Sequence, residues 1–131
     1  SVLYASTHQM PLYPGTGAAS ETGAGNIVNA PLPAGAGDTE FYEALTERVF
    51  PAMIAFAPDF IIISAGFDAH WRDPLASLNL NEDDFAWATD AVMEIADRRC
   101  GGRIVSLLEG GYDLTALADS AAAHVAALMK A

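Results

Sequence analysis

Two residues of this chain have the type and surroundings of groups that do chemistry, Asp68 and Tyr112. Asp68 lies just past an apolar run, and a carboxylate is a good ligand for zinc. Tyr112 follows two glycines, which let a backbone approach a ligand closely, and its hydroxyl can donate to a developing oxyanion. A catalytic zinc needs about three protein ligands and an open position, so Asp68 and the nearby His70 do not complete such a site.

A structural role is an alternative to a functional one for both residues and for the other reactive side chains. Asp68 can be satisfied by backbone amides of its own loop, and Tyr112 can be a ring packed over a glycine turn. His8 could be a base, but it follows an apolar run, a position more typical of a hydrogen-bonded structural residue. His124 lies in an alanine-rich segment and is also interpreted as structural. Cys100 sits at a predicted helix C-terminus, without the positive surroundings that activate a thiol.

Four apolar runs predict the strands that would position these groups. Three of them are continuous, as in strands buried on both faces of a parallel sheet, and they span residues 2–6, 60–64 and 103–108. A shorter run at 27–30 is a fourth candidate. Ligands of parallel sheets bind beyond the carboxyl ends of the strands, so the loops that follow these runs are expected to converge on one site.

Helical patterns occupy the segments between the apolar runs. The first helix is predicted from Asp38 to Phe56, with Asp38 or Thr39 as its cap and with a kink or break at Pro51. The second begins after the cap Asn81 and ends at the left-handed cap Gly101. The third runs from about Leu114 to Met129. Strands alternating with helices predict an α/β fold with a parallel sheet.

The composition describes an acidic chain of 131 residues, enough for one domain with a single core. Seventeen acidic against six basic residues give a net charge of −11, which argues against a nucleic-acid partner and is compatible with cationic or neutral ligands. A well-solvated surface explains the same charge. The single cysteine suits a reducing compartment, so a cytoplasmic location is expected. No apolar run approaches the roughly 20 residues that span a bilayer, so no membrane partner is expected.

Four motifs, in order and at matching spacing, make the chain resemble a known family. They are Ser6-Thr7-His8, then Tyr13-Pro14-Gly15-Thr16-Gly17, then Ser64-Ala65-Gly66-Phe67-Asp68-Ala69-His70 with Asp73-Pro74-Leu75, and finally Glu109-Gly110-Gly111-Tyr112-Asp113-Leu114. Together they resemble the histone deacetylase / acetylpolyamine amidohydrolase superfamily, above all its bacterial class II-like and acetylpolyamine-type members. The resemblance implies an arginase/deacetylase-like three-layer αβα fold with a mainly parallel sheet. Residues 1–131 would be a single domain, the C-terminal portion of the catalytic domain.

The resemblance also implies roles for individual residues. Asp68 would be one of three zinc ligands, and Tyr112 would be catalytic, donating its hydroxyl to the substrate amide oxygen. Tyr13, Gly111 and Phe67 would contact the substrate or shape the narrow channel that holds its acylated side chain.

Other roles implied by the resemblance concern the surroundings of the zinc. Ser6 and Thr7 would help to bind a structural potassium ion, and His70 and Asp73 would lie in the shell behind the metal ligands. The family's other two zinc ligands and its paired-histidine proton relay precede the residues that match Ser1 and are not in this sequence. Because Ser1 opens directly into a strand-like run, we expect the chain to be a fragment.

The activity expected from the resemblance is zinc-dependent removal of acetyl groups from acetylated amines, either acetyl-lysine or acetylpolyamines. The chain alone is expected to be inactive and to self-associate through surfaces that normally pack on the missing half. One alternative is a non-catalytic binding module or pseudoenzyme that keeps the fold. Another is an arginase-like metallohydrolase, against which the Glu-Gly-Gly-Tyr motif argues.

Overall fold

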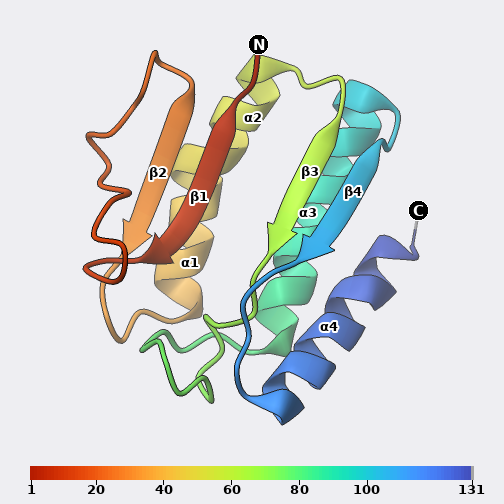
Figure 1. Ribbon diagram of the computed structural model, residues 1–131. Helices are drawn as coiled ribbons and strands as arrows, with labels where there is room; N and C mark the ends of the chain where they lie inside the picture. The colour runs from red at the N-terminus through yellow and green to blue at the C-terminus, as the bar shows by residue number, and fades with distance from the viewer. Residues whose placement is uncertain (131) are drawn as a thin grey trace.

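The structure, a computed structural model, describes residues 1–130 as alternating strands and helices (Figure 1). The strands are β1 (Tyr4–Gln9), β2 (Ile27–Leu32), β3 (Ile61–Ala65) and β4 (Ile104–Leu108). The helices are α1 (Asp38–Ala44), the π-helical η1 (Leu45–Val49), α2 (Phe50–Phe56), α3 (Glu82–Cys100) and α4 (Leu114–Leu128). The predicted alternation is confirmed. None of the described helices is long and apolar enough to cross a membrane.

The strands form two parallel pairs rather than one continuous sheet. β1 pairs with β2 from Tyr4 opposite Ile27 onward, and β3 pairs with β4 from Ile61 opposite Ile104 onward. Within residues 1–130 no strand ladder joins the two pairs. All four strands point the same way in Figure 1, so their carboxyl ends lie at one end of the molecule. β1 runs on to Gln9, beyond the apolar run that predicted it, because its ladder with β2 continues through polar residues.

The first helical segment covers the predicted range but begins and bends differently from the prediction. Its N-cap is Gly37, not Asp38 or Thr39, and the Gly37 N–H donates to Glu40 Oε2 at 2.9 Å. The predicted break at Pro51 takes the form of the π-helical turns of η1 just ahead of it. Proline lacks an N–H and its ring crowds the preceding turn, and a wider turn accommodates both defects.

The other two helices start and stop where the sequence predicts. Asn81 Oδ1 accepts the Asp83 N–H at 3.0 Å, and Gly101 ends α3 with a φ of 60°. Asp113 caps α4 by accepting the Ala116 N–H at 2.8 Å.

One face of the β3–β4 pair is covered by helices and the other is open. Ile104 packs with the α3 side chains, and Ser106 bonds to His124 of α4, so both helices lie on that face. Successive strand residues point to opposite faces, so Ile62, Val105 and Leu107 point away from the helices, and all three are exposed. The prediction that these strands are buried on both faces is therefore wrong for the described chain, because no described helix covers the second face.

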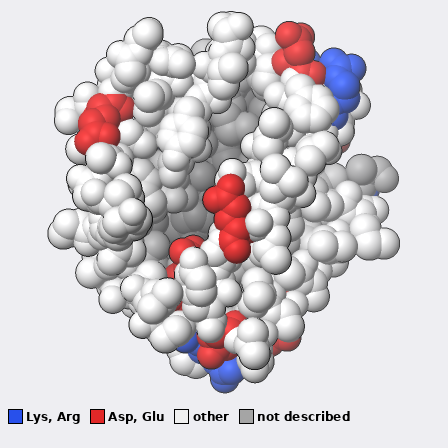
Figure 2. Space-filling model, in the orientation of Figure 1, with Lys and Arg blue, Asp and Glu red and all other residues white. Residues whose placement is uncertain are grey.

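A cavity of about 1420 Å³ separates the two strand pairs. Its walls include every residue of β1 and of β3, and helix residues such as Phe41, Leu45 and Phe85 contribute to it. Figure 2 shows it as a hollow at the centre of this face of the molecule. The predicted site residues lie at or near the carboxyl-end side of this cavity.

Candidate active site at the carboxyl ends of the strands

Asp68 lies in the loop after β3, between two glycines that make room for its carboxylate. A Cβ built at Gly110 would lie 2.7 Å from Asp68 Oδ2, and one built at Gly66 would lie 3.1 Å from Oδ1. The Phe67 N–H donates to the Gly110 carbonyl at 2.8 Å, which holds the loops after β3 and β4 side by side. Asp68 lines the cavity, so its carboxylate is held on the cavity wall by a close fit against backbone.

The surroundings of Asp68 disfavour its charged form in the absence of a cation. Burial raises the pKa of the Asp68 carboxyl above its usual range, and the negative charges of Asp73 and Glu109 raise it further. Its own backbone N–H acts in the opposite direction but ranks below burial. Among residues 1–130 no salt bridge includes Asp68. The structural interpretation, in which loop amides satisfy this carboxylate, therefore accounts for only part of its environment.

Other acidic residues besides Asp68 line the cavity. Four carboxylate residues line it, and no Lys or Arg side chain of the described chain does so; the four are Glu21, Asp59, Asp68 and Glu109. Figure 2 shows acidic side chains beside the hollow, with basic ones only toward the edges of the view. Such a cavity favours a cation or a cationic ligand.

Asp68 fits one position of a metal site, but the rest of such a site is not in the described chain. Residues 1–130 contain no group of three or more His, Cys, Asp or Glu side chains arranged to hold a metal ion. His70 does not face the metal position together with Asp68, because its ring nitrogens bond elsewhere. Its Nδ1 accepts the Arg72 N–H at 3.1 Å, so its Nε2 carries the proton donated to Glu82 Oε1 at 2.8 Å.

Tyr112 follows Gly110 and Gly111 in the loop after β4. Its N–H donates to Asp73 Oδ2 at 3.0 Å, and its side chain is 55% exposed. Gly111 has a φ of 138°, and a Cβ there would lie 3.0 Å from a Leu117 methyl, so the turn requires glycine. Of this loop, Glu109 and Gly110 line the cavity and Tyr112 does not. The structure thus brings the loops of Asp68 and Tyr112 together and leaves the phenol in solvent just beyond the cavity.

Asp73 links these two loops. Its Oδ1 accepts the N–H groups of Leu75 at 2.8 Å and Ala76 at 3.2 Å, while Oδ2 accepts the one from Tyr112. The Asp73 side chain is buried, and backbone donors alone satisfy it. The carboxylate therefore holds its own turn and the neighbouring loop at the same time.

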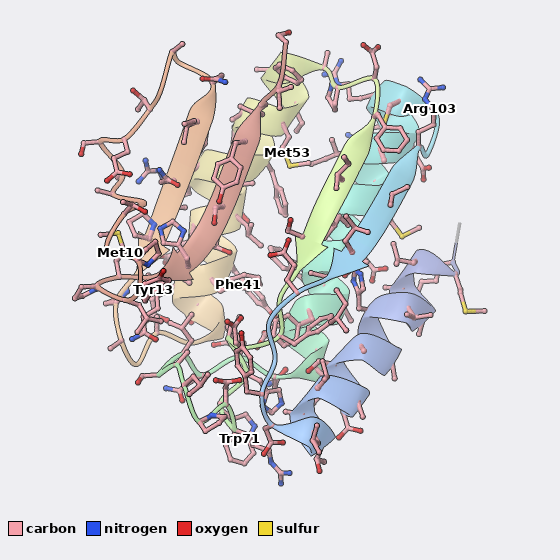
Figure 3. All side chains as sticks on the ribbon, in the orientation of Figure 1. Met10, Tyr13, Phe41, Met53, Trp71 and Arg103 are labelled. Carbon is pink, nitrogen blue, oxygen red and sulfur yellow. The ribbon has the colours of Figure 1, made fainter. Side chains whose placement is uncertain are left out.

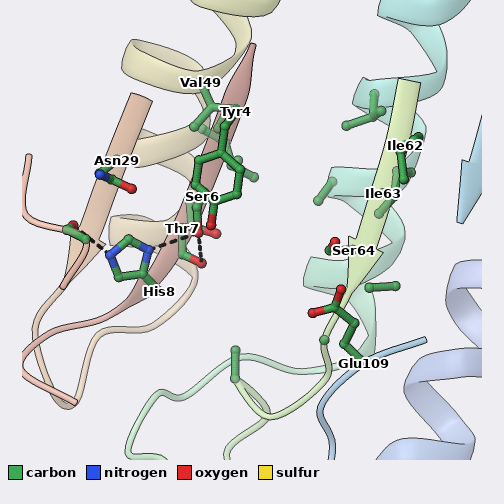
Figure 4. Close-up of a pocket in the computed structure, with 18 of the residues that line it drawn as sticks. Tyr4, Ser6, Thr7, His8, Asn29, Val49, Ile62, Ile63, Ser64 and Glu109 are labelled. Carbon is green, nitrogen blue, oxygen red and sulfur yellow. Dashed lines mark hydrogen bonds between the residues drawn. The ribbon is translucent and has the colours of Figure 1, made fainter. Parts of the chain in front are cut away.

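The loop after β1 brings Tyr13 to the rim of the cavity. Tyr13 is 96% exposed and lies beyond the carboxyl end of β1 (Figure 3). His8 ties this loop to the strand, because its Nε2 donates to the Gly17 carbonyl at 2.8 Å and its Nδ1 bonds to Ser6 Oγ at 2.9 Å. The interpretation of His8 as a hydrogen-bonded structural residue is confirmed. Figure 4 shows His8 and Glu109 on opposite sides of the pocket.

The potassium site predicted at Ser6 and Thr7 stays a prediction. Both residues line the cavity, and the Ser6 hydroxyl lies near the Thr7 carbonyl, at 3.4 Å, as well as bonding to His8. The oxygens are thus close together on β1, but the Ser6 hydroxyl already has a partner.

Phe67 and His124 pack beneath the site. Phe67 is 4% exposed. Its ring packs edge-on against the rings of Phe85 and His124, with 5.1 Å and 5.7 Å between ring centroids. The Phe67 side chain packs in the core and Phe67 also lines the cavity, so its predicted contact with substrate stays a prediction. His124 bonds to Thr89 Oγ1 and to Ser106 Oγ, both at 2.7 Å, which confirms its structural role. Burial lowers the pKa of His124.

Glu109 and the two glycines beside Asp68 were not singled out from the sequence as separate site residues. Glu109 is the first residue after β4, and its N–H donates to the Ala65 carbonyl at 3.0 Å. Its position at a strand's carboxyl end was the signal available in the sequence. The close fit of Gly66 and Gly110 against Asp68 had no such signal, because it depends on how the two loops approach each other.

Comparisons with known proteins agree with this arrangement. Residues 1–128 match the family described as the histone deacetylase domain. The chain is 44% identical over 125 residues to histone deacetylase 10, chloroplastic, of Oryza sativa subsp. japonica, covering 92% of this chain and 28% of that protein. It is 45% identical over 117 residues to a probable deacetylase of Archaeoglobus fulgidus, covering 86% of this chain and 33% of that protein. The chain thus spans about a third of the length of these relatives.

Two solved structures have the same fold over nearly the whole of this chain. The crystal structure of the HDA15 HD domain has a TM-score of 0.91 at 39% identity and covers 98% of this chain and 37% of that one. The acetylpolyamine aminohydrolase from Burkholderia pseudomallei has a TM-score of 0.84 at 30% identity and covers 97% of this chain and 37% of that one. The two strand pairs, their helices and the loops around Asp68 are therefore part of an arginase/deacetylase-like fold, and the chain belongs to the histone deacetylase / acetylpolyamine amidohydrolase superfamily.

Proposed function

We propose that this chain is the C-terminal part of a zinc-dependent deacetylase, and that it supplies one zinc ligand, Asp68, and the oxyanion donor, Tyr112. The observation that carries the proposal is the half-buried carboxylate of Asp68, held between Gly66 and Gly110 on an acidic cavity wall without a basic partner. A cation placed against this carboxylate would offset the desolvation and the negative neighbours that oppose its charge.

Three residues of this chain have separate roles in the proposed reaction. Bound zinc would polarise the acetyl carbonyl and lower the pKa of a bound water to about 7. Asp68 would fix one coordination position, because Gly66 and Gly110 bound its carboxylate on two sides and leave it facing the cavity. Tyr112 would donate its hydroxyl to the carbonyl oxygen as negative charge develops there. Tyr13, at the cavity rim, would pack beside the acylated chain of the substrate.

The remaining zinc ligands and the general base are proposed to come from residues outside this chain, on a further strand that occupies the cavity between β1 and β3. Both flanking pairs are parallel and point the same way, and each has a strand edge without a partner in the described chain. A parallel strand placed there would end beside Asp68. The HDA15 domain supports this, because it matches the whole arrangement while most of its length lies outside the match.

The acidic residues at the carboxyl ends of the strands favour a cationic substrate. Asp68 and Glu109 line the cavity there, and no Lys or Arg of the described chain lines it, so a second amine on the substrate would be attracted. This feature favours acetylated polyamines over acetyl-lysine in proteins. Similar proteins carry names of both kinds, histone deacetylase and acetylpolyamine aminohydrolase.

The test uses the zinc-loaded full-length protein, assayed on an acetyl-lysine peptide and on a monoacetylated diamine. We expect hydrolysis, with the higher kcat/KM on the diamine, and loss of both zinc and activity in Asp68→Asn. Asp84→Asn is the matched control, because Asp84 is a buried carboxylate with its own hydrogen bonds, to Tyr42 and Asn81, on the N-terminal turn of α3. A full-length protein that binds no zinc and hydrolyses neither substrate would support the alternative, a non-catalytic module with the deacetylase fold.

A further inference from the structure

The geometry points to Asp73 as the residue that positions Tyr112 against Asp68, an inference that rests on the proposed function. The buried Asp73 carboxylate joins the loop after β3 to the loop after β4 through one hydrogen bond, from Tyr112 N to Oδ2 at 3.0 Å.

Asp73 has more contacts than a turn of its own would need. The bonds that Oδ1 accepts from Leu75 and Ala76 are local and stabilise the turn after Asp73. The bond to Tyr112 reaches a residue 39 positions away and uses the other oxygen. With both oxygens engaged, the carboxylate cannot rotate without breaking contacts to one of the two loops.

Tyr112 depends on this bond because little else fixes it. The residues before it are glycines, which constrain the backbone weakly, and its side chain is more than half exposed. On its other side Asp113 is fixed as the cap of α4. The hydrogen bond from the Tyr112 amide to Asp73 thus fixes the loop after β4 relative to the loop that carries Asp68. An error of about 1 Å in the place of a catalytic group can cost about 10²-fold in rate.

His70 does not replace Asp73 in this role. His70 is 1% exposed and holds the same loop through Glu82 and the Arg72 N–H, but its hydrogen bonds do not reach the loop after β4. The Phe67 N–H also donates to the Gly110 carbonyl and joins the two loops, but it acts two residues before Tyr112. Among the side-chain hydrogen bonds of residues 1–130, only the one to Asp73 acts on Tyr112 itself.

The test is Asp73→Asn in the zinc-loaded full-length enzyme, which keeps the side-chain shape and removes one acceptor. We expect kcat to fall at least about tenfold with KM and zinc content nearly unchanged, because substrate and metal contacts remain while Tyr112 is misplaced. In a Tyr112→Phe background the same substitution is expected to have no further effect on kcat, since the hydroxyl it positions is already absent. Asp84→Asn is the control and is expected to lower stability without lowering kcat.

A second readout does not depend on activity. Hydrogen exchange of the Tyr112 amide is expected to be faster in Asp73→Asn than in the wild type, at equal protection of the β3–β4 ladder. Unchanged exchange at Tyr112 overturns the positioning role, whatever the protein catalyses. An equal loss of kcat with and without the Tyr112 hydroxyl also overturns it. A wild-type protein without deacetylase activity contradicts the proposed function instead, and the exchange measurement then still decides the role of Asp73.

Discussion

Asp68 Oδ2 lies 2.7 Å from the point at which a Cβ of residue 110 would stand. The two residues come from loops that follow neighbouring strands, and they meet because β3 and β4 pair in parallel. Gly110 thus determines where the carboxylate can lie, although it carries no chemistry of its own. The glycine is required by this contact and not by its backbone, because its φ is outside the left-handed region.

Gly110→Ala is therefore predicted to displace Asp68 with little damage to the fold. The new methyl group would meet the end of a short side chain, which can swing away into the cavity. In the full-length protein we expect zinc affinity to fall roughly 10–100-fold, the range seen when groups that orient metal ligands are changed. Metal titration against a competing chelator measures the change.

Gly37→Ala is the matched control for that substitution. A Cβ at Gly37 would lie 3.7 Å from its nearest neighbour, the Asn79 carbonyl oxygen, which is ordinary contact. Alanine is a poorer N-cap than glycine, so stability is expected to fall by up to about 1 kcal/mol while zinc affinity stays the same. Equal zinc affinity in the wild type and in Gly110→Ala would show that the close contact between Gly110 and Asp68 does not position a metal ligand.

Tyr112→Phe is predicted to lower kcat of the full-length enzyme roughly 10²–10³-fold, the usual cost of removing one oxyanion donor. KM and zinc content are expected to stay close to wild type, because the ring and the Asp73 bond to the Tyr112 amide remain. Steady-state kinetics and metal analysis of the purified variant check both. Near-normal turnover would remove Tyr112 from the mechanism.

Most of the elements and the place of the site could be predicted from local patterns. Asn81 and Gly101 mark the ends of α3 because capping depends only on neighbouring residues. The loops of Asp68 and Tyr112 could be predicted to lie side by side because each follows an apolar run, and parallel strands end at one edge of a sheet.

The errors concern features that depend on distant residues. Ile62, Val105 and Leu107 have the character of buried strand residues, but burial depends on what covers them, which a local pattern does not contain. The link from Asp73 to Tyr112 spans 39 positions, which no local pattern contains.

The chain of residues 1–131 alone is predicted to bind zinc weakly and to be inactive. Its described residues offer one carboxylate for the metal and no group of three ligands. We expect a zinc titration of the purified chain to show no tight site, and we expect no release of acetate from an acetyl-lysine reporter. Robust hydrolysis by this chain would contradict the proposal that ligands and base come from elsewhere.

His124 is predicted to make stability depend on pH. Burial lowers its folded pKa below the unfolded value of 6.5, so the unfolded chain binds a proton more readily. The stability that the neutral, buried His124 contributes to the folded state is fully present above pH 6.5. It is lost as pH falls through the window between 6.5 and the lower folded pKa. Urea unfolding of the full-length protein between about pH 7.5 and about pH 5.5 measures this loss.

His124→Gln isolates that effect from the other two histidines. Glutamine can still donate to one hydroxyl and accept from the other, at Thr89 and Ser106, but it does not titrate. The variant is expected to be less stable than wild type at neutral pH, with a difference that shrinks toward low pH. A difference that is constant across the range would show that His124 keeps its ordinary pKa in the folded protein.

The isolated chain is also predicted to self-associate through the open face of β3 and β4. Ile62, Val105 and Leu107 expose apolar surface on the face opposite the helices, and the neighbouring strand edge has no partner in the described chain. Sedimentation of residues 1–131 should reveal dimers or larger species that dissociate when Ile62→Lys and Leu107→Lys are combined. Leu114→Lys is the control, because Leu114 is also apolar and even more exposed but lies at the start of α4, outside this face. A monomeric chain, or equal dissociation by the control, would show that the exposed strand face does not drive association.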